Sequence, residues 1–257
     1  MAASTVRARN WATASSNAIH ADDVAASYGF GGGLVPGVGL FAYLVHPALE
    51  QFGPGWLAAG TLSARFTTPV YEGEEITLDV APSGEARLID AAGEVRAAGV
   101  AGTAPGPAPD PDGYEVLPPP EVKPGADDVE LVPGQALGTV GWTYRTKLGQ
   151  AHLDELGVRA PPGLEASTAH PGYLLRLAND VLAVNVSLGP WIHTGSEVAL
   201  HRRVVDGERL EARARVARSW EKRGNRWVEL DVLVLADGHP ALHARHTAIY
   251  RLAPPTT

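Results

Sequence analysis

The feature that most constrains the fold is an internal repeat with a period of about half the chain. Five landmarks recur in order: Pro36, Gly37, Trp56 and Gly60 against Pro171, Gly172, Trp191 and Gly195, and Glu72-Gly73 against Asp206-Gly207. The first four pairs are 135 residues apart and the last pair is 134 apart, in a chain of 257 residues. Ordered coincidences at one offset indicate a duplication, so we expect two units of the same fold.

A proline-rich segment separates the two repeats. Nine of the 21 prolines lie between Pro105 and Pro133. Because proline fixes φ and lacks a backbone donor, we expect this segment to be extended and without regular structure. The sequence therefore predicts an N-terminal unit over residues 1–103, a linker over 104–133 and a C-terminal unit over 134–257.

Each repeat contains an apolar helix followed by segments of strand character. Residues 36–52 are apolar on nearly all sides, which is typical of a buried helix, although Pro47 is expected to kink or divide it. The counterpart in the second repeat is 171–186. Later segments, such as 226–235 and 241–251, have the composition and turns of antiparallel strands. We therefore predict an α+β fold in which a curved antiparallel sheet wraps one helix per repeat.

Composition and charge exclude several classes of protein. The net charge of −8 argues against nucleic-acid binding, and the lack of cysteine excludes disulfides and thiolate chemistry. No apolar run reaches the roughly 18–20 residues of a membrane span, and the N-terminus lacks the apolar segment of a signal peptide. The scattered histidines form no metal-ligand pattern. We therefore expect a cytoplasmic protein that uses neither a metal nor another cofactor.

The segment 15–37 resembles the signature of the MaoC-like, or (R)-specific enoyl-CoA hydratase, family. That signature reads Asp-x-Asn-Pro-(Ile/Val)-His-x-Asp and leads through a Gly-rich stretch into a buried helix. The matching positions are Asn17, Ile19, His20 and Asp22, with Gly37 at the start of the helix. The resemblance implies a hot-dog fold. Two repeats imply a double hot-dog, which holds the family's usual dimer within one chain.

Two positions depart from the family pattern. Ser15 stands where the family has its catalytic Asp, and Ala18 stands where it has Pro. In the family, the Asp and His together activate a water, and a backbone N–H stabilises the thioester enolate. A serine hydroxyl does not take a proton near neutral pH unaided, and general acid–base catalysis contributes about 10²–10⁴ in rate. Asp22 and Asp23 are interpreted as carboxylates at a helix N-terminus, with a replacement base as the alternative.

His20, Asn17, Ser15 and Gly37 are the predicted catalytic residues. The imidazole of His20 donates or accepts a proton at physiological pH. We expect Asn17 and Ser15 to position the substrate or water. The N–H of Gly37, at a helix N-terminus, suits a developing enolate oxygen. The alternatives are that Asn17 and His20 only brace a loop and that Gly37 only permits a tight turn.

Polar residues at the second helix are the predicted substrate-binding residues. Arg176, Asn179 and Asp180 lie on a helix whose counterpart is apolar, and His170 precedes it. Buried polar groups need partners or a polar cavity, so these side chains, with His193, are expected to line a pocket. The alternative is a solvated helix face on which Arg176 and Asp180 pair at i, i+4.

A run of basic residues in the second repeat has two interpretations. It is either the solvent face of antiparallel strands or a docking surface for the phosphates of coenzyme A or for an acidic acyl carrier protein. The run consists of Arg202, Arg203, Arg209, Arg213, Arg215, Arg218, Lys222, Arg223 and Arg226.

These observations predict a hydratase- or dehydratase-type enzyme, a hydro-lyase, acting on an acyl thioester or a related conjugated carbonyl compound. The substrate is a small molecule carried on coenzyme A or on an acyl carrier protein. One alternative is an isomerase, cyclase or thioesterase acting on a biosynthetic intermediate, and another is a non-catalytic protein that binds an acyl or other apolar ligand. A homodimer stays open as well, since two fused repeats supply the usual dimer contact within one chain.

Overall fold

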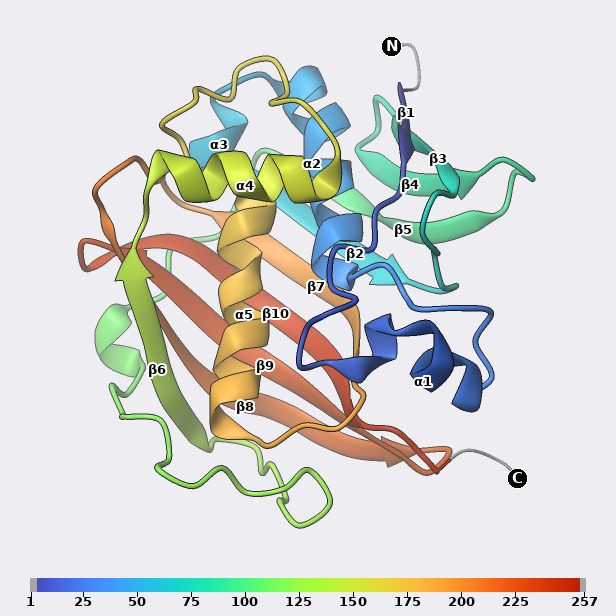
Figure 1. Cartoon of the computed structure of the whole chain (residues 1–257). Coiled ribbons are helices and arrows are strands. Elements are labelled where there is room, and N and C mark those ends of the chain that lie inside the picture. The colour runs from blue at the N-terminus through green and yellow to red at the C-terminus, as the bar shows by residue number, and fades with distance from the viewer. Residues whose placement is uncertain (1–3, 255–257) are drawn as a thin grey trace.

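The computed structural model describes residues 4–254. These residues form one ten-stranded antiparallel sheet that curves around two long helices (Figure 1). The strands are β1 (Ser4–Arg7), β2 (Thr61–Phe66), β3 (Glu75–Val80), β4 (Glu85–Asp90), β5 (Val95–Gly102), β6 (Ala136–Thr143), β7 (Ile192–Leu200), β8 (Arg209–Lys222), β9 (Asn225–Ala236) and β10 (His239–Arg251). The helices are η1 (Ala18–His20), α1 (Asp22–Ser27), α2 (Gly37–Phe52), α3 (Trp56–Ala59), η2 (Pro111–Gly113), α4 (Thr146–Leu156) and α5 (Pro171–Asn185).

The strand order reflects the two repeats. It runs β1-β3-β4-β5-β2-β7-β10-β9-β8-β6, so each repeat contributes one contiguous half of the sheet. The halves join where β2 and β7 pair antiparallel, from Thr61 opposite Ala199 to Arg65 opposite Gly195. Together with the two central helices, this arrangement confirms the predicted double hot-dog fold.

Equivalent backbone hydrogen bonds give the register of the repeat. The N–H of Val35 donates to the carbonyl of Val70, and the N–H of Ala169 donates to that of Val204, both at 2.8 Å. The offset between these pairs is 134, one residue less than the offset of the proline–glycine dipeptides. These backbone hydrogen bonds therefore align the two repeats at an offset of 134, which is also the offset between Glu72-Gly73 and Asp206-Gly207.

The same register relates the starts of the two helices. His170 precedes α5 where Pro36 precedes α2, and the carbonyls of both residues accept the first helical hydrogen bonds. Gly73 and Gly207, also 134 apart, both have positive φ in the turn before the third strand of their repeat. His170, rather than Pro171, is therefore the counterpart of Pro36.

The helices α2 and α5 lie side by side against the concave face of the sheet (Figure 1). A Cβ atom at Gly172 would lie 2.5 Å from that of Ala42, so a glycine is needed for this close approach. Pro47 does not divide α2, contrary to one of the outcomes expected from the sequence. Neighbours such as Tyr43 and Leu44 are fully buried, and their packing holds the helix together despite the missing N–H.

The segment between the repeats contains no strand over 103–135 and packs against the outer face of the sheet. The Tyr114 hydroxyl donates to the Asp231 carboxylate at 2.8 Å, and the Arg215 guanidinium lies 4.9 Å from the centre of the tyrosine ring. The unit boundaries at 103 and 134 stay a prediction. Among residues 4–254, no helix is long and apolar enough to cross a membrane.

Candidate active site

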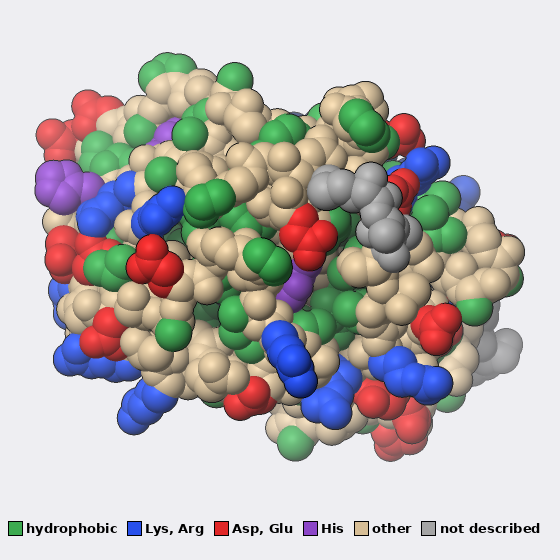
Figure 2. Space-filling model, turned by 90° about the horizontal axis from the view of Figure 1, so that it is seen from above, with side chains coloured by type: hydrophobic (Ala, Val, Ile, Leu, Met, Phe, Trp, Pro, Cys, Tyr) green, Lys and Arg blue, Asp and Glu red, His purple; other side chains and the backbone are tan. Residues whose placement is uncertain are grey.

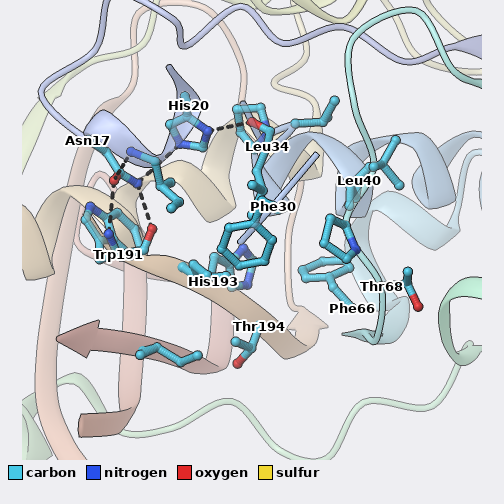
Figure 3. A pocket seen from close by; sticks show the side chains of 18 of the residues that line it. Asn17, His20, Phe30, Leu34, Leu40, Phe66, Thr68, Trp191, His193 and Thr194 are labelled. Atoms are coloured by element: carbon cyan, nitrogen blue, oxygen red, sulfur yellow. Dashed lines mark hydrogen bonds between the residues drawn. The ribbon is translucent and has the colours of Figure 1, made fainter. Parts of the chain in front are cut away.

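A largely apolar cavity of about 270 Å³ lies where the two repeats meet (Figure 3). The first repeat contributes residues 17–40 and 66–70, and the second contributes parts of α5, β7, β9 and β10. Polar side chains occur at a few positions only: Asn17, His20, Thr67, Thr68, Asn179, Trp191, His193, Thr194 and Trp227. An apolar chamber with a few polar groups is typical of a small-molecule site.

Asn17 joins the two repeats at one end of this cavity. Its Oδ1 accepts hydrogen bonds from the N–H groups of Trp191 at 3.1 Å and Ile19 at 3.4 Å. Its Nδ2 donates to the Trp191 carbonyl at 3.0 Å and to Nε2 of His20 at 3.2 Å (Figure 3). Both polar groups of the amide are therefore occupied by the protein itself, and one of them holds the His20 ring.

The hydrogen bonds of His20 define which nitrogen carries the proton. Nδ1 lies 2.6 Å from the carbonyl oxygen of Leu34, which only accepts, so the proton is on Nδ1. Nε2 then presents its lone pair beside Asn17. Burial lowers the pKa of His20, and the hydrogen bond to Leu34 opposes that effect. The half-buried ring is therefore neutral at pH 7 and is a base at Nε2.

Gly37 is the first residue of α2 and lies against the ring of His193. Within residues 4–254, the N–H groups of Gly37 and Val38 have no hydrogen-bond acceptor. A Cβ atom at Gly37 would lie 2.7 Å from Nδ1 of His193. Gly37 does not have positive φ, so a glycine is needed for this close approach and not for a tight turn. The free N–H groups and the helix dipole create a positive potential here.

Three buried polar atoms of lining residues have no protein partner in the described part of the chain. They are Nδ1 of His193, Oδ1 of Asn179 and Nε1 of Trp227. An unsatisfied buried polar group costs about 1–3 kcal/mol, and a bound ligand or water recovers that cost. The residues of the cavity wall therefore hold buried polar atoms that the rest of the described chain leaves unpaired.

The structure keeps Ser15 out of the cavity. The side chain is exposed, and its Oγ donates to the carbonyl of Asn17 at 3.3 Å. Asp22 accepts the N–H of Gly33 at 2.7 Å and lines a different hollow. Among residues 4–254, no Asp or Glu lines the cavity. Ser15 does not line it either, so the only support for a catalytic role of Ser15 is its place in the motif.

Of the predicted substrate-binding residues, the structure brings only Asn179 to the cavity. Arg176 and Asp180 line a separate hollow between α4, α5 and β6. Arg176 pairs with Glu155 at 2.6 Å and not with Asp180, whose pKa is raised to about 6 by burial, against the effect of Arg176. His170 is buried and caps α5, since its Nδ1 accepts the N–H of Gly172 at 3.0 Å.

The sequence did not identify several of the lining residues as part of a site. Trp191, Thr194, Trp227 and Ile249 reach the cavity through the pairing of strands that are far apart in the chain. His193 was expected in a pocket, but nothing in the sequence gave it a role. No local pattern signals these positions, because the β2–β7 junction brings them together.

Within residues 4–254, four of the nine side chains in the basic run of the second repeat are paired with acidic neighbours. Its ion pairs are Arg202 with Glu208, Arg213 with Glu211 at 2.6 Å, Arg215 with Asp231 at 2.9 Å and Arg218 with Glu229 at 2.7 Å. The face of the molecule in Figure 2 also has basic and acidic side chains intermingled. These pairs favour the solvent face of antiparallel strands as the interpretation of those four residues.

Comparisons with known proteins agree with this architecture. No protein-family model matches the sequence, and no curated protein matches it. Among solved structures, one described as a MaoC domain dehydratase from Chloroflexus aurantiacus is 13% identical with a TM-score of 0.60, covering 98% of this chain and 96% of that one. A conserved Mycobacterium tuberculosis protein with a double hotdog fold is 15% identical with a TM-score of 0.58, covering 96% and 93%.

A third solved structure represents a different activity on the same fold. It is described as an oleoyl thioesterase from Lactobacillus plantarum and is 13% identical with a TM-score of 0.56, covering 99% of this chain and 96% of that one. At these identities the likeness establishes the fold, and function has to be argued from the site. The chain is therefore a double hot-dog protein with the architecture of MaoC-like dehydratases.

Proposed function

We propose that the chain is a divergent MaoC-like enzyme that hydrates or dehydrates an acyl thioester or a related conjugated carbonyl compound. One observation carries the proposal. A neutral imidazole, His20, carries the lone pair of Nε2 at the wall of an apolar cavity that also contains the free N–H of Gly37, and the substrate replaces the Asn17 amide at this lone pair. A base and an anion-stabilising donor in one water-poor chamber are what abstraction of a proton next to a carbonyl requires.

In the dehydration direction, the thioester oxygen accepts the N–H of Gly37. Nε2 of His20 takes the proton from the α-carbon, and the electron pair forms an enolate. The enolate collapses to the conjugated double bond as the bond from the β-carbon to its hydroxyl breaks. The imidazolium returns its proton to the departing hydroxide, which leaves as water. One imidazole therefore completes the proton balance, and hydration is the reverse path.

Isomerisation of a double bond is the second candidate, and the lack of a lining carboxylate among the described residues favours it. Such a reaction needs one base to remove a proton and return it at another carbon, with no water to activate. Hydrolysis of the thioester is less well supported, because it needs a nucleophile or an activated water at the carbonyl carbon.

The carrier of the acyl group is proposed to lie in a neighbouring hollow of about 530 Å³. This hollow shares Phe66, Thr194 and Trp227 with the cavity and also contains four basic side chains. Of these, Arg65 and Lys222 form no ion pair within residues 4–254. Free cations next to the cavity support a phosphate-bearing carrier, such as coenzyme A or a phosphopantetheine arm.

The test is turnover of enoyl and 3-hydroxyacyl thioesters, offered both on coenzyme A and on phosphopantetheine. We expect conversion by the wild type and a loss of about 10²–10⁴ in rate for His20→Ala, since that is the range of general acid–base catalysis. His239→Ala is the control, because that histidine is exposed at the start of β10 and does not line the cavity. Absence of turnover by the wild type, or an unchanged rate in His20→Ala, contradicts the proposal.

A further inference from the structure

Two histidines and a serine form a buried hydrogen-bonded chain that ends at the cavity. Oγ of Ser196 lies 2.9 Å from Nε2 of His193 and 3.0 Å from Nδ1 of His246. Ser196 is directly opposite His246 in the β7–β10 pairing, and the two imidazoles stack with their centres 4.1 Å apart. All three side chains are buried, and only His193 lines the cavity.

The outer nitrogens of the two imidazoles determine where the protons of this hydrogen-bonded group lie. Nε2 of His246 is buried and has no hydrogen-bond partner in the described part of the chain. Within residues 4–254, both outer nitrogens lack a protein partner, and a buried N–H without an acceptor is the costlier state, so the unpaired N–H belongs at the end where a ligand can accept it. Only His193 lines the cavity, so the proton of His246 belongs on Nδ1, where Ser196 accepts it. The single hydroxyl hydrogen of Ser196 then points to Nε2 of His193.

His193 must therefore carry its own proton on Nδ1. This nitrogen is the one that lies against Gly37 and lacks a protein partner. Burial lowers the pKa of His193 well below its usual value and that of His246 to about 3, and the stacked His246 ring further lowers the pKa of His193. Both imidazoles are neutral at pH 7, so the cavity receives a neutral N–H donor.

We propose that His193 is a catalytic residue whose Nδ1–H donates a hydrogen bond to the substrate oxygen on which negative charge develops, beside the N–H of Gly37. Ser196 and His246 are positioning residues that fix the tautomer. This inference rests on the proposed function and names the second donor of its anion site. No bond to hydrogen breaks at His193, because a neutral imidazole polarises a carbonyl without giving up its proton.

The two repeats then divide the chemistry between them. His20 from the first repeat presents a lone pair, and His193 from the second presents an N–H, into the same cavity (Figure 3). The ring of Phe66 meets that of His193 edge-on at 5.0 Å and 83°, which restrains its rotation. A base and a neutral donor facing each other allow proton transfer at the α-carbon without the carboxylate that the cavity lacks.

The tautomer is tested by NMR on protein labelled with ¹⁵N at histidine, without ligand, at pH 7. We expect His193, assigned by its loss in His193→Gln, to be protonated at Nδ1 and bare at Nε2. In Ser196→Ala we expect both tautomers, and in Ser196→Thr, which keeps the hydroxyl, the Nδ1–H form again. A proton on Nε2 of His193 in the wild type overturns the inference.

The catalytic role is tested with butyryl-CoA labelled with ¹³C at the thioester carbonyl, which lacks the groups needed for dehydration. We expect the carbonyl stretch to move to lower frequency on binding and to return partway in His193→Phe. With reactive substrates, kcat of that variant should fall by about 10²–10³, as for loss of one donor to an oxyanion, while KM changes little. His239→Phe is the matched control.

The outcomes separate the two proposals. If butyryl-CoA binds and its carbonyl frequency is the same in wild type and His193→Phe, the role of His193 is overturned while the proposed function stands. If the wild type turns over no enoyl or 3-hydroxyacyl thioester on either carrier, the proposed function fails and the role of His193 fails with it.

Discussion

Asn17 and Asn185 make nearly the same hydrogen bonds at two different places and so form a matched pair for mutation. Asn185, at the end of α5, accepts the N–H of Gly138 at 2.7 Å and donates to the carbonyls of Gly138 at 2.9 Å and Val181 at 2.8 Å. Asn17 binds both backbone groups of Trp191 in the same manner, but its third bond goes to His20. Only Asn17 lines the cavity.

We predict that Asn17→Ala and Asn185→Ala both lower the free energy of unfolding, by about 2–4 kcal/mol. A net hydrogen bond contributes about 0.5–1.5 kcal/mol, and a buried group left without a partner costs about 1–3 kcal/mol. Three bonds are lost in Asn185→Ala and four in Asn17→Ala, of which the one from the N–H of Ile19 is long at 3.4 Å. Asn185 is 7% exposed and Asn17 is half-buried, so the larger loss is expected for Asn185. Urea denaturation, read by tryptophan fluorescence, measures both.

Activity separates the two variants. In Asn17→Ala the His20 ring loses the amide that holds its Nε2, so we expect kcat/KM to fall at least about tenfold. Because that amide binds the neutral form of the imidazole, its loss raises the pKa of His20, and the limb of the pH profile that reports the free base moves to higher pH. In Asn185→Ala, both kcat/KM and the profile should stay as in the wild type. Equal effects of the two variants on activity would refute the positioning role of Asn17.

Three further predictions follow from the packing. Gly37→Ala should cost about 1–3 kcal/mol in thermal or urea unfolding and reduce turnover, because its Cβ collides with His193; a fully stable and active variant contradicts this. Burial lowers the pKa of His46 to about 4 and that of His152 to about 3. Below pH 6.5 the unfolded chain therefore binds more protons than the folded one, and the free energy of unfolding should fall by about 2 kcal/mol per histidine between pH 6.5 and pH 5. Urea midpoints that do not change with pH over this range would contradict the prediction. Tyr114→Phe should cost about 1.5–3 kcal/mol, since it removes the bond to Asp231, and an unchanged midpoint would mean that the inter-repeat segment is not held there.

The fold could be predicted from the sequence because the residues that mark the repeat are ones that the backbone or the packing requires. Gly172 is needed where α2 and α5 approach closely, and Gly73 and Gly207 are needed for their positive φ. The composition of 104–133 also predicted a segment without regular structure, and the structure has no strand there, although it has the short helix η2. The composition did not predict that Tyr114 anchors this segment on the sheet, since that contact depends on Asp231 in a distant strand.

The site was accessible only in part. Asn17 and His20 followed from a local motif, because both lie on one short turn whose residues are close in the chain. The same motif suggested a role for Ser15, which lies two residues before the turn, is exposed and does not line the cavity, so that role stays a prediction. Arg176 and Asp180 share one face of α5, whereas Asn179 lies about a quarter turn from Asp180 and faces the cavity.

The most direct test of the account is a crystal structure of the protein with a bound unreactive acyl thioester such as butyryl-CoA. We predict the acyl chain in the cavity, with its carbonyl oxygen within hydrogen-bond distance of the Gly37 N–H and of Nδ1 of His193. The α-carbon should lie about 3–3.5 Å from Nε2 of His20, the separation of a near-attack geometry. A thioester bound elsewhere, or bound in the cavity with its carbonyl turned away from Gly37 and its α-carbon out of reach of His20, would contradict the account.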